Sequence, residues 1–270
     1  MCAGAASYAL CREFFCGVLM RFFLCSAMVF LTGCANFITP ARPVNAMVGP
    51  FNAVQPFSLT SVGESAPPGW EPWILSRFMA RTQYGIIEHE GERVLAAKAN
   101  ISASGLLQPL VLAATDYPFI NWRWKVPQLI PGANNASRLG DDSPVRVIVA
   151  FDGDMSKLDF EDQAFGRTVK LFSGRDMPYA TIQYIWENQL PRETVLENAR
   201  TSRSKMLVVE SGPERLGQWL SFKRDVRADY QRLFGETPGS IIFVGVMTDS
   251  NATGTQATAY YGDIRFSREE

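Results

Sequence analysis

The stretch FINWRWKV at residues 119–126 alternates apolar and polar side chains with the period of two that is typical of a half-buried β-strand. Trp122 and Trp124 share one face of this stretch, and Arg123 lies on the opposite face. Residues 145–151, VRVIVAF, are mostly apolar on both faces, which is typical of a strand in the middle of a sheet. These two stretches predict a β-sheet fold with at least one strand buried on both faces.

The period of two recurs after residue 57, interrupted at short intervals by Gly, Pro and Asn. It predicts further strands at residues 84–90, 93–99, 180–186, 206–210, 241–247 and 258–266. Helical spacing of apolar residues predicts two helices at residues 159–172 and 225–234. Many strands, few helices and no alternation of the two predict an all-β fold, a jelly-roll-like β-sandwich that forms one domain over residues 57–270.

The N-terminus has the pattern of a signal peptide. Residues 22–31 form an apolar run that follows Arg21, and the run is about half the ~20 residues that a membrane-spanning helix needs. The sequence LTGC at residues 31–34 resembles the lipobox of bacterial lipoproteins. This resemblance implies that residues 1–33 are a signal peptide and that lipid is attached to Cys34.

The resemblance also gives a destination. Ala35 follows the cysteine, where lipoproteins kept in the inner membrane usually have Asp, so the outer membrane is expected, with the protein facing the periplasm. Residues 34–56 contain four prolines and are predicted to be an extended tether. The alternative is an uncleaved membrane anchor over residues 14–31; Arg21 interrupts it and suggests Met20 as the true start.

Composition excludes several classes of function. All 5 cysteines lie at or before Cys34, so the predicted domain has none for disulfides or a Cys-type zinc site. The only histidine, His89, lies near a predicted hairpin tip, where an exposed side chain is expected instead of a catalytic base. The chain has 26 basic and 27 acidic residues and no basic stripe, so no nucleic-acid partner is predicted. It also lacks the motifs of serine hydrolases, P-loop proteins and dinucleotide-binding proteins.

The candidate ligand-binding residues are side chains that a sandwich could turn outward. Sugar recognition uses a flat aromatic ring together with charged or amide groups that bind hydroxyls. The candidates are Arg123, Asp141, Asp142, Arg146, Tyr184, Trp186, Asp249 and Asn251. The alternatives are that Trp186 belongs to the core and that Asp141 and Asp142 form a structural ion pair with Arg146. No catalytic residue and no cofactor is predicted.

Residues 152–162 are acidic enough to suggest a structural calcium ion. They fail the EF-hand pattern, because Lys157 occupies the position of its glycine and Gln163 that of its closing glutamate. A solvated loop before a helix is therefore preferred, and no metal site is predicted.

Several spaced tracts carry a further resemblance. They are DDSPVRV at residues 141–147, YIW at 184–186, RDV at 224–226 with DY at 229–230, FG at 234–235, and MTDSN at 247–251 leading to AYYGDI at 259–264. Together they resemble an uncharacterised bacterial domain-of-unknown-function family of exported proteins with a single β-rich domain, over about residues 57–266. The closing strand also resembles the last strand of jelly-roll carbohydrate-binding modules. The first resemblance brings no activity, and the second is an analogy of fold.

The sequence thus predicts an outer-membrane lipoprotein whose sandwich binds a ligand, with a cell-envelope glycan as the leading candidate and no catalysis. One alternative is a glycoside hydrolase or lyase in which two carboxylates face each other across a groove, drawn from Asp141, Asp142, Glu187, Asp249 and Asp263. Another is a structural lipoprotein that assists envelope assembly, which would expose a large apolar patch instead of a polar groove.

Overall fold

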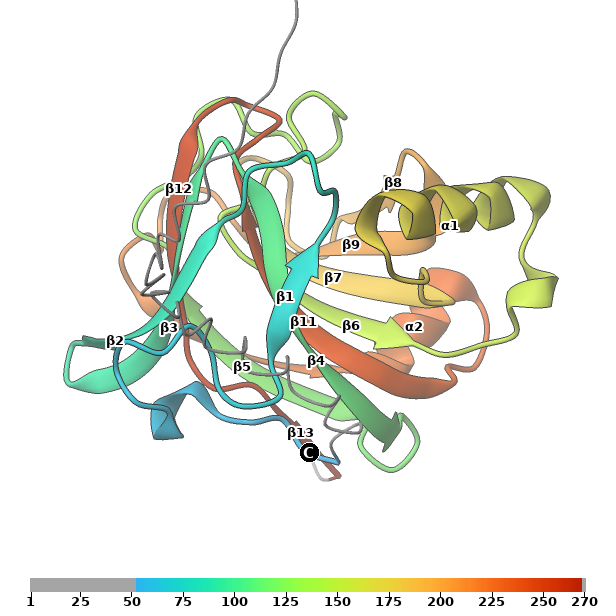
Figure 1. Ribbon diagram of the computed structural model, residues 1–270, viewed down its shortest axis with the longest axis horizontal. Coiled ribbons are helices and arrows are strands. Elements are labelled where there is room, and N and C mark those ends of the chain that lie inside the picture. Colours follow the sequence, from blue (N-terminus) through green and yellow to red (C-terminus); the bar gives the residue numbers. More distant parts are fainter. Residues whose placement is uncertain (1–51, 269–270) are drawn as a thin grey trace, which may run out of the picture. The chain divides into compact units, whose positions relative to one another are not determined.

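Residues 52–268 are described by a computed structural model, and they form two β-sheets packed face to face (Figure 1). The first sheet has seven strands in the spatial order β1 (Glu71–Ile74), β4 (Ala103–Ala113), β11 (Ser240–Asp249), β6 (Arg146–Phe151), β7 (Ala180–Glu187), β9 (Thr201–Ser211) and β8 (Val195–Asn198). The second has six: β10 (Trp219–Asp225), β5 (Phe119–Lys125), β12 (Gln256–Tyr261), β3 (Glu92–Asn100) and β2 (Gln83–His89) in order, with β13 (Arg265–Ser267) also paired to β5.

The core lies between the inner faces of the two sheets. Trp122 of β5 stacks on Tyr184 of β7 with ring centroids 5.0 Å apart, and Trp124 and Trp186 are fully buried beside them. All six residues of β6 are buried, as expected for a strand covered on both faces.

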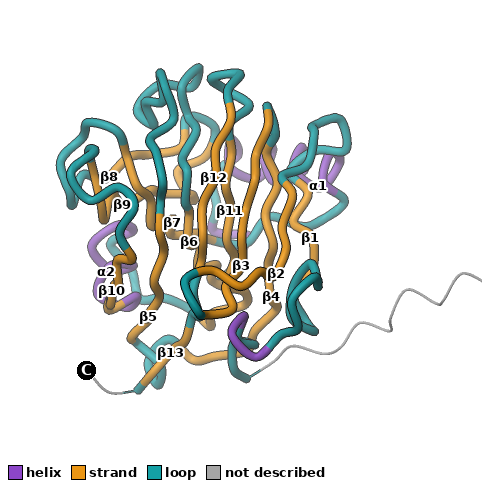
Figure 2. Tube along the Cα trace, turned by 90° about the vertical axis from the view of Figure 1, so that its left-hand side faces the viewer, coloured by secondary structure: helices purple, strands orange, loops and turns teal. Residues whose placement is uncertain are grey.

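Two helices accompany the sheets (Figure 2). The first, α1 (Phe160–Ser173), begins where the Asp159 side chain accepts a hydrogen bond from the amide of Asp162, and it ends at Gly174 in the left-handed conformation. The second, α2 (Val226–Phe234), is capped in the same way by Asp225 and Gly235. Short 3-10 turns lie at Phe57–Leu59 and Met155–Lys157. Within residues 52–268, neither helix is long and apolar enough to cross a membrane.

The predicted all-β sandwich with two helices is confirmed. Differences concern β1, β4, β8 and β10, which the pattern did not reveal, and the predicted strand at 258–266, which is divided into β12 and β13. Strand β4 is obscured by Pro109, since proline rarely occurs within a central strand. Here Pro109 pairs with Phe243 beside a bulge in β11, where the ladder is already interrupted. The predicted signal peptide, Cys34 and most of the tether lie outside the described residues.

The core position of Trp186 leads to a stability prediction. Trp186→Ala should lower the free energy of unfolding by about 3–5 kcal/mol, because it leaves a cavity between the sheets. Urea unfolding followed by circular dichroism measures the change. Leu139→Ala is the control, since Leu139 is 84% exposed and should change stability by no more than about 0.5 kcal/mol. Equal midpoints for the two variants would contradict the placement of Trp186.

Candidate functional site

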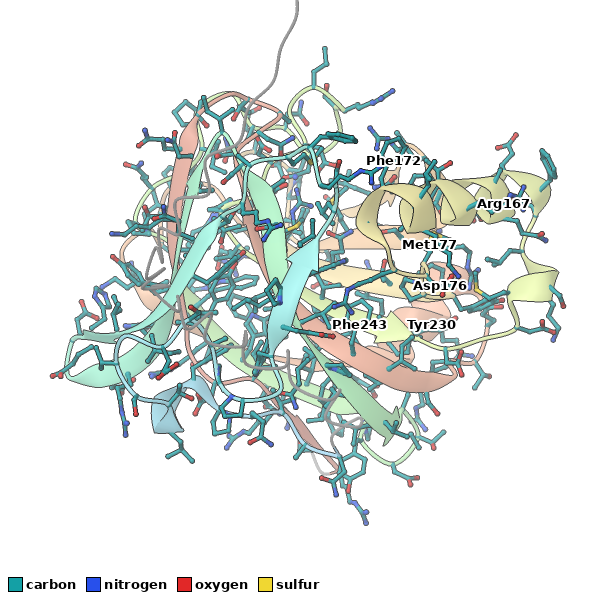
Figure 3. The ribbon with its side chains drawn as sticks, in the orientation of Figure 1. Arg167, Phe172, Asp176, Met177, Tyr230 and Phe243 are labelled. Atoms are coloured by element: carbon teal, nitrogen blue, oxygen red, sulfur yellow. The ribbon has the colours of Figure 1, made fainter. Side chains whose placement is uncertain are left out.

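The outer face of the seven-stranded sheet forms the floor of a groove of about 1050 Å³. One wall is α1 with the loop that follows it at residues 174–179, and another is the loop at residues 75–79 after β1. Figure 3 labels Phe172 and Met177 on the first wall and Phe243 on the floor. The volume lies just above the range of about 300–1,000 Å³ that small-molecule sites occupy.

Strand register places two glycines in the middle of the floor. Trp73, Gly105, Met247 and Arg146 pair in one row across β1, β4, β11 and β6. Gly245 lies in the next row, opposite Leu107. The two glycines remove side chains from the middle of the floor, while large side chains stand on either side of them.

The indole of Trp73 lies over these two glycines. A Cβ atom at Gly105 would come within 3.3 Å of Cε3 of Trp73, and one at Gly245 within 3.6 Å. The ring also meets Phe243 in an edge contact, with centroids 5.5 Å apart. Trp73 and Phe243 both line the groove. The sheet therefore presents a supported aromatic surface to whatever enters.

Arg146 is the charged centre of the floor and is itself buried. Its Nε and Nη2 donate to the two carboxylate oxygens of Asp249 at 2.9 and 3.0 Å, and Nη2 also donates to Asp141 at 2.9 Å. Nη1 donates to Oε1 of Gln183 at 3.3 Å. The backbone amide of Ser143 gives Asp249 a third hydrogen bond. A two-point guanidinium–carboxylate contact is among the strongest in proteins, so this cluster is rigid.

Burial and neighbouring charges shift the pKa values of this cluster in opposite directions. Burial raises the pKa of Asp249 to about 6, although Arg146 acts to lower it. Burial also acts to raise the pKa of Asp141, but Arg146 and Asn135 together hold that pKa below its usual value. For Arg146, burial acts to lower the pKa, and the two carboxylates outweigh it and raise the pKa. The guanidinium therefore stays charged.

Of the predicted site residues, the structure brings Asp141, Arg146, Asp249 and Asn251 to this groove. Asp142 is buried next to it and accepts hydrogen bonds from the amides of Ala252 and Thr253 at 3.1 and 2.7 Å. Asp142 thus fixes the loop that carries Asn251, and it does not face the groove.

The predicted outward positions of Tyr184 and Trp186 are corrected by the structure. Both are fully buried, because their face of β7 points to the second sheet. The Tyr184 hydroxyl donates to Asp229 at 2.9 Å, and Nε1 of Trp186 donates to the carbonyl of Gly212 at 3.1 Å. Neither residue can contact a ligand in the groove.

Arg123 lies on the outer face of the other sheet, away from the groove. It pairs with Glu92, and its guanidinium lies 4.8 Å from the ring centre of Trp219. His89 is on the same face and is half-buried instead of exposed, because its ring stacks on Tyr260 at 4.1 Å. Arg123 therefore does not belong to the same site as the four predicted residues that line the groove, Asp141, Arg146, Asp249 and Asn251.

The carboxylates considered for hydrolysis have structural partners. Asp141 and Asp249 share Arg146. Glu187 is buried and accepts from the amide of Leu190 at 2.6 Å, and Asp263 accepts from the amide of Ser58 at 2.9 Å. Two carboxylates facing each other across an open groove, as the hydrolase alternative requires, are not found among these five residues.

The acidic stretch at residues 152–162 supports the first turn of α1. Asp159 caps the helix, and Asp162 accepts hydrogen bonds from the hydroxyls of Thr201 and Ser202 at 2.5 and 2.6 Å. In the part of the chain that the structure describes, no three His, Cys, Asp or Glu side chains are grouped as a metal ion would require.

Sequence reasoning missed Trp73, Phe243 and the inner face of α1. The available signal was glycine inside strands at Gly105 and Gly245, because such a glycine often marks a place where another group approaches the backbone closely. Gly245 lies in the predicted strand at residues 241–247, whereas the signal at Gly105 could be used only if β4 had been recognised as a strand.

Comparison with known proteins gives a family and distant similarities. A family model described as "Protein of unknown function (DUF3047)" matches residues 68–265. No curated protein sequence matches the chain.

Among solved structures, the chain is similar to the family 30 carbohydrate-binding module of the cellulosomal cellulase Cel9D-Cel44B of Clostridium thermocellum, with 12% identity, 82% of this chain and 99% of that chain covered, and a TM-score of 0.41. It is also similar to the family 11 module of Lic26A-Cel5E from the same organism, with 10% identity, 77% and 92% covered, and a TM-score of 0.36. The carbohydrate recognition domain of Emp47p gives 11% identity, 81% and 95% covered, and a TM-score of 0.40. These similarities are too distant to transfer a ligand or a residue role.

The Arg146 cluster leads to a pH-dependent prediction. Arg146→Met leaves Asp249 buried without its cation, which should cost about 3–5 kcal/mol of unfolding free energy at pH 8. The pKa of Asp249 in the folded protein, already about 6, should rise further above its unfolded value of about 4. A carboxyl with a raised folded pKa stabilises the fold at low pH and loses that contribution as pH rises through the folded pKa. The decrease in unfolding free energy that Arg146→Met causes should therefore be smaller at pH 5 than at pH 8.

Urea unfolding of both proteins at the two pH values measures this effect. The control is the double variant with Arg146→Met and Asp249→Asn, which lacks the buried charge and should show little of the pH difference. A single-variant loss that is the same at pH 5 and pH 8 would contradict the coupling.

Proposed function

The chain belongs to the DUF3047 family, whose description gives no function, and on that premise we propose that this protein binds a glycan in the groove of its seven-stranded sheet. The observation that carries the proposal is the Trp73 indole, supported from below by Gly105 and Gly245 and lining the groove. A flat aromatic ring offers the C–H face of a sugar ring a large apolar contact at little cost in side-chain entropy.

Polar groups for sugar hydroxyls lie around this ring. Asp141 is partly exposed, with 31% of its side chain open to solvent. Asn135, Gln183 and Asn251 also line the groove, and together they provide amide donors and acceptors. Because Arg146 already holds the two carboxylates in place, a ligand meets hydrogen-bonding groups whose positions are fixed in advance.

Binding without catalysis is the better account of this arrangement. A general acid and a general base need separate carboxylates with room for substrate between them. Asp141 and Asp249 are both tied to one guanidinium instead, at 2.9 Å each. The pair is therefore suited to holding a ligand and the adjacent loops.

The proposal includes a location. The LTGC tetrad at residues 31–34 supports attachment of lipid to Cys34 and anchoring in the outer membrane on the periplasmic side. Several acyl chains at ~0.8 kcal/mol per buried CH₂ would hold the protein at the membrane surface. The groove would then sample the glycans of the cell envelope.

The glycan proposal is tested by Trp73→Ala. A glycan array of cell-wall and surface polysaccharides should identify a binder, and calorimetry should then show at least about a tenfold loss of affinity in the variant, since about 1.4 kcal/mol corresponds to a factor of ten. Trp219→Ala on the other sheet is the matched control and should bind normally. The proposal fails if no glycan binds, or if the two variants bind equally well.

The location is tested by Cys34→Ser. Wild-type protein should incorporate labelled palmitate in cells and sediment with outer membranes, whereas the variant should incorporate none and leave the membrane fraction. Circular dichroism of the released variant controls for folding. Palmitate incorporation by the variant would show that Cys34 is not the site of attachment.

A further inference from the structure

The groove is unusually rich in methionine. All five methionines within residues 52–268 line it, namely Met79, Met155, Met177, Met206 and Met247. The buried members of the main core between the sheets include none, and of the five only Met177 packs against that core from outside it. Methionine is flexible and polarisable, and it is favoured on surfaces that must adapt to an apolar partner. Its concentration here indicates an occupant with a flexible apolar part.

The helix α1 turns an apolar face towards this space. Phe165, Val169 and Phe172 follow helical spacing on one side of α1 and line the groove, yet none of them is fully buried. A surface helix normally buries such a stripe against the core. The single buried residue of α1 is Asp162, an acidic anchor at its first turn. The stripe of α1 therefore faces open volume.

The helix is held at its two ends. At the start, Asp162 binds Thr201 and Ser202 at the beginning of β9. At the end, the amide of Arg77 donates to the carbonyl of Phe172 at 3.4 Å, and Arg175 pairs with Glu71 of β1 at 3.0 Å. Because both ends are attached to the sheet, α1 spans the groove, and the space beneath it does not depend on packing of its middle.

The apolar part and the polar part of the groove are continuous. Along β11, Asp249 and Met247 stand beside Arg146, and Phe243 stands towards the other end of the strand. At about 3.3 Å per residue, Met247 and Phe243 are roughly 13 Å apart along the strand. Trp73 contacts Phe243 and shares a row with Met247, so it lies where the two parts meet.

We infer that the part of the groove lined by Phe243 and the apolar stripe of α1 is a binding site for an acyl chain, so that the ligand is a glycolipid with its sugar at Trp73 and Arg146. The sugar end rests on the function proposed above, whereas the acyl site rests on the five methionines and the stripe of α1. Phe78 is 76% exposed, and its ring centroid lies 6.4 Å from that of Phe172. These two rings give the acyl chain an apolar opening.

Alkyl maltosides with chains of six, eight and ten carbons provide the probe, because they share one head group and differ only in chain length. They are titrated, below micelle-forming concentration, into the full-length chain carrying Cys34→Ser, so that no lipid attached at Cys34 competes. Affinity should rise about fourfold for each added CH₂, the factor that about 0.8 kcal/mol per buried CH₂ gives.

The variant Val169→Asp places a charge beneath α1 and should abolish the dependence on chain length. Leu171→Asp makes the same kind of change on a residue that is 68% exposed and does not line the groove, and it should keep the dependence. Unfolding midpoints confirm that both variants fold. A flat dependence in the parent chain, or the same dependence in both variants, overturns the acyl site.

Trp73→Ala separates this inference from the proposed function. If the sugar binds at Trp73, the variant should lower the affinity for all three maltosides by a similar factor and leave the increase per CH₂ unchanged. If the glycan proposal is wrong and the acyl site is right, Trp73→Ala leaves the increase per CH₂ intact and the glycan array stays blank. If the glycan array is positive but the affinity of the parent chain does not depend on chain length, the glycan proposal is supported and the acyl site is overturned.

Discussion

The structure of the groove depends on the ion pairs of one buried cation, the guanidinium of Arg146. Arg146 stands at the start of a strand that is covered on both faces, where an unpaired charge would cost several kcal/mol. Its partners come from two different places, Asp141 in the loop before β6 and Asp249 at the end of β11. Meeting this single requirement brings both segments to the same end of the sheet. Asp142 then fixes the next loop by accepting backbone amides.

A second constraint is steric. Trp73 lies across β4 and β11, where a Cβ atom at Gly105 would crowd its indole at 3.3 Å and one at Gly245 would touch it at 3.6 Å. In a filled floor the same positions would carry apolar residues that pack against α1, and the helix would sit directly on the sheet. Here α1 is attached by its ends, so the middle of the floor stays open. The open groove therefore follows from where the glycines, the tryptophan and the helix anchors are placed.

The fold was more accessible to sequence reasoning than the site. Alternation in residues 119–126 and 145–151 reports directly on burial, and the capping residues of α1 and α2 mark helix ends by local chemistry. Local patterns do not tell which face of a strand meets the other sheet. That choice put Trp186 of β7 in the core and Arg146 of β6 in the groove. Trp73 was missed because its position on the floor of the groove depends on Gly105 and Gly245, which follow it by 32 and 172 positions.

The pairing of Arg146 and the position of α1 also bear on the proposed ligand. The guanidinium of Arg146 is held by two carboxylates, so the polar end of the groove has a fixed geometry. The proposed glycolipid needs a fixed polar end for its sugar and an apolar part that adapts to its acyl chain. The rigid cluster around Arg146 meets the first need. Met79 and Met155, each 40% exposed, meet the second. The two halves of the groove thus differ in polarity, which suits a ligand with a polar head and an apolar chain.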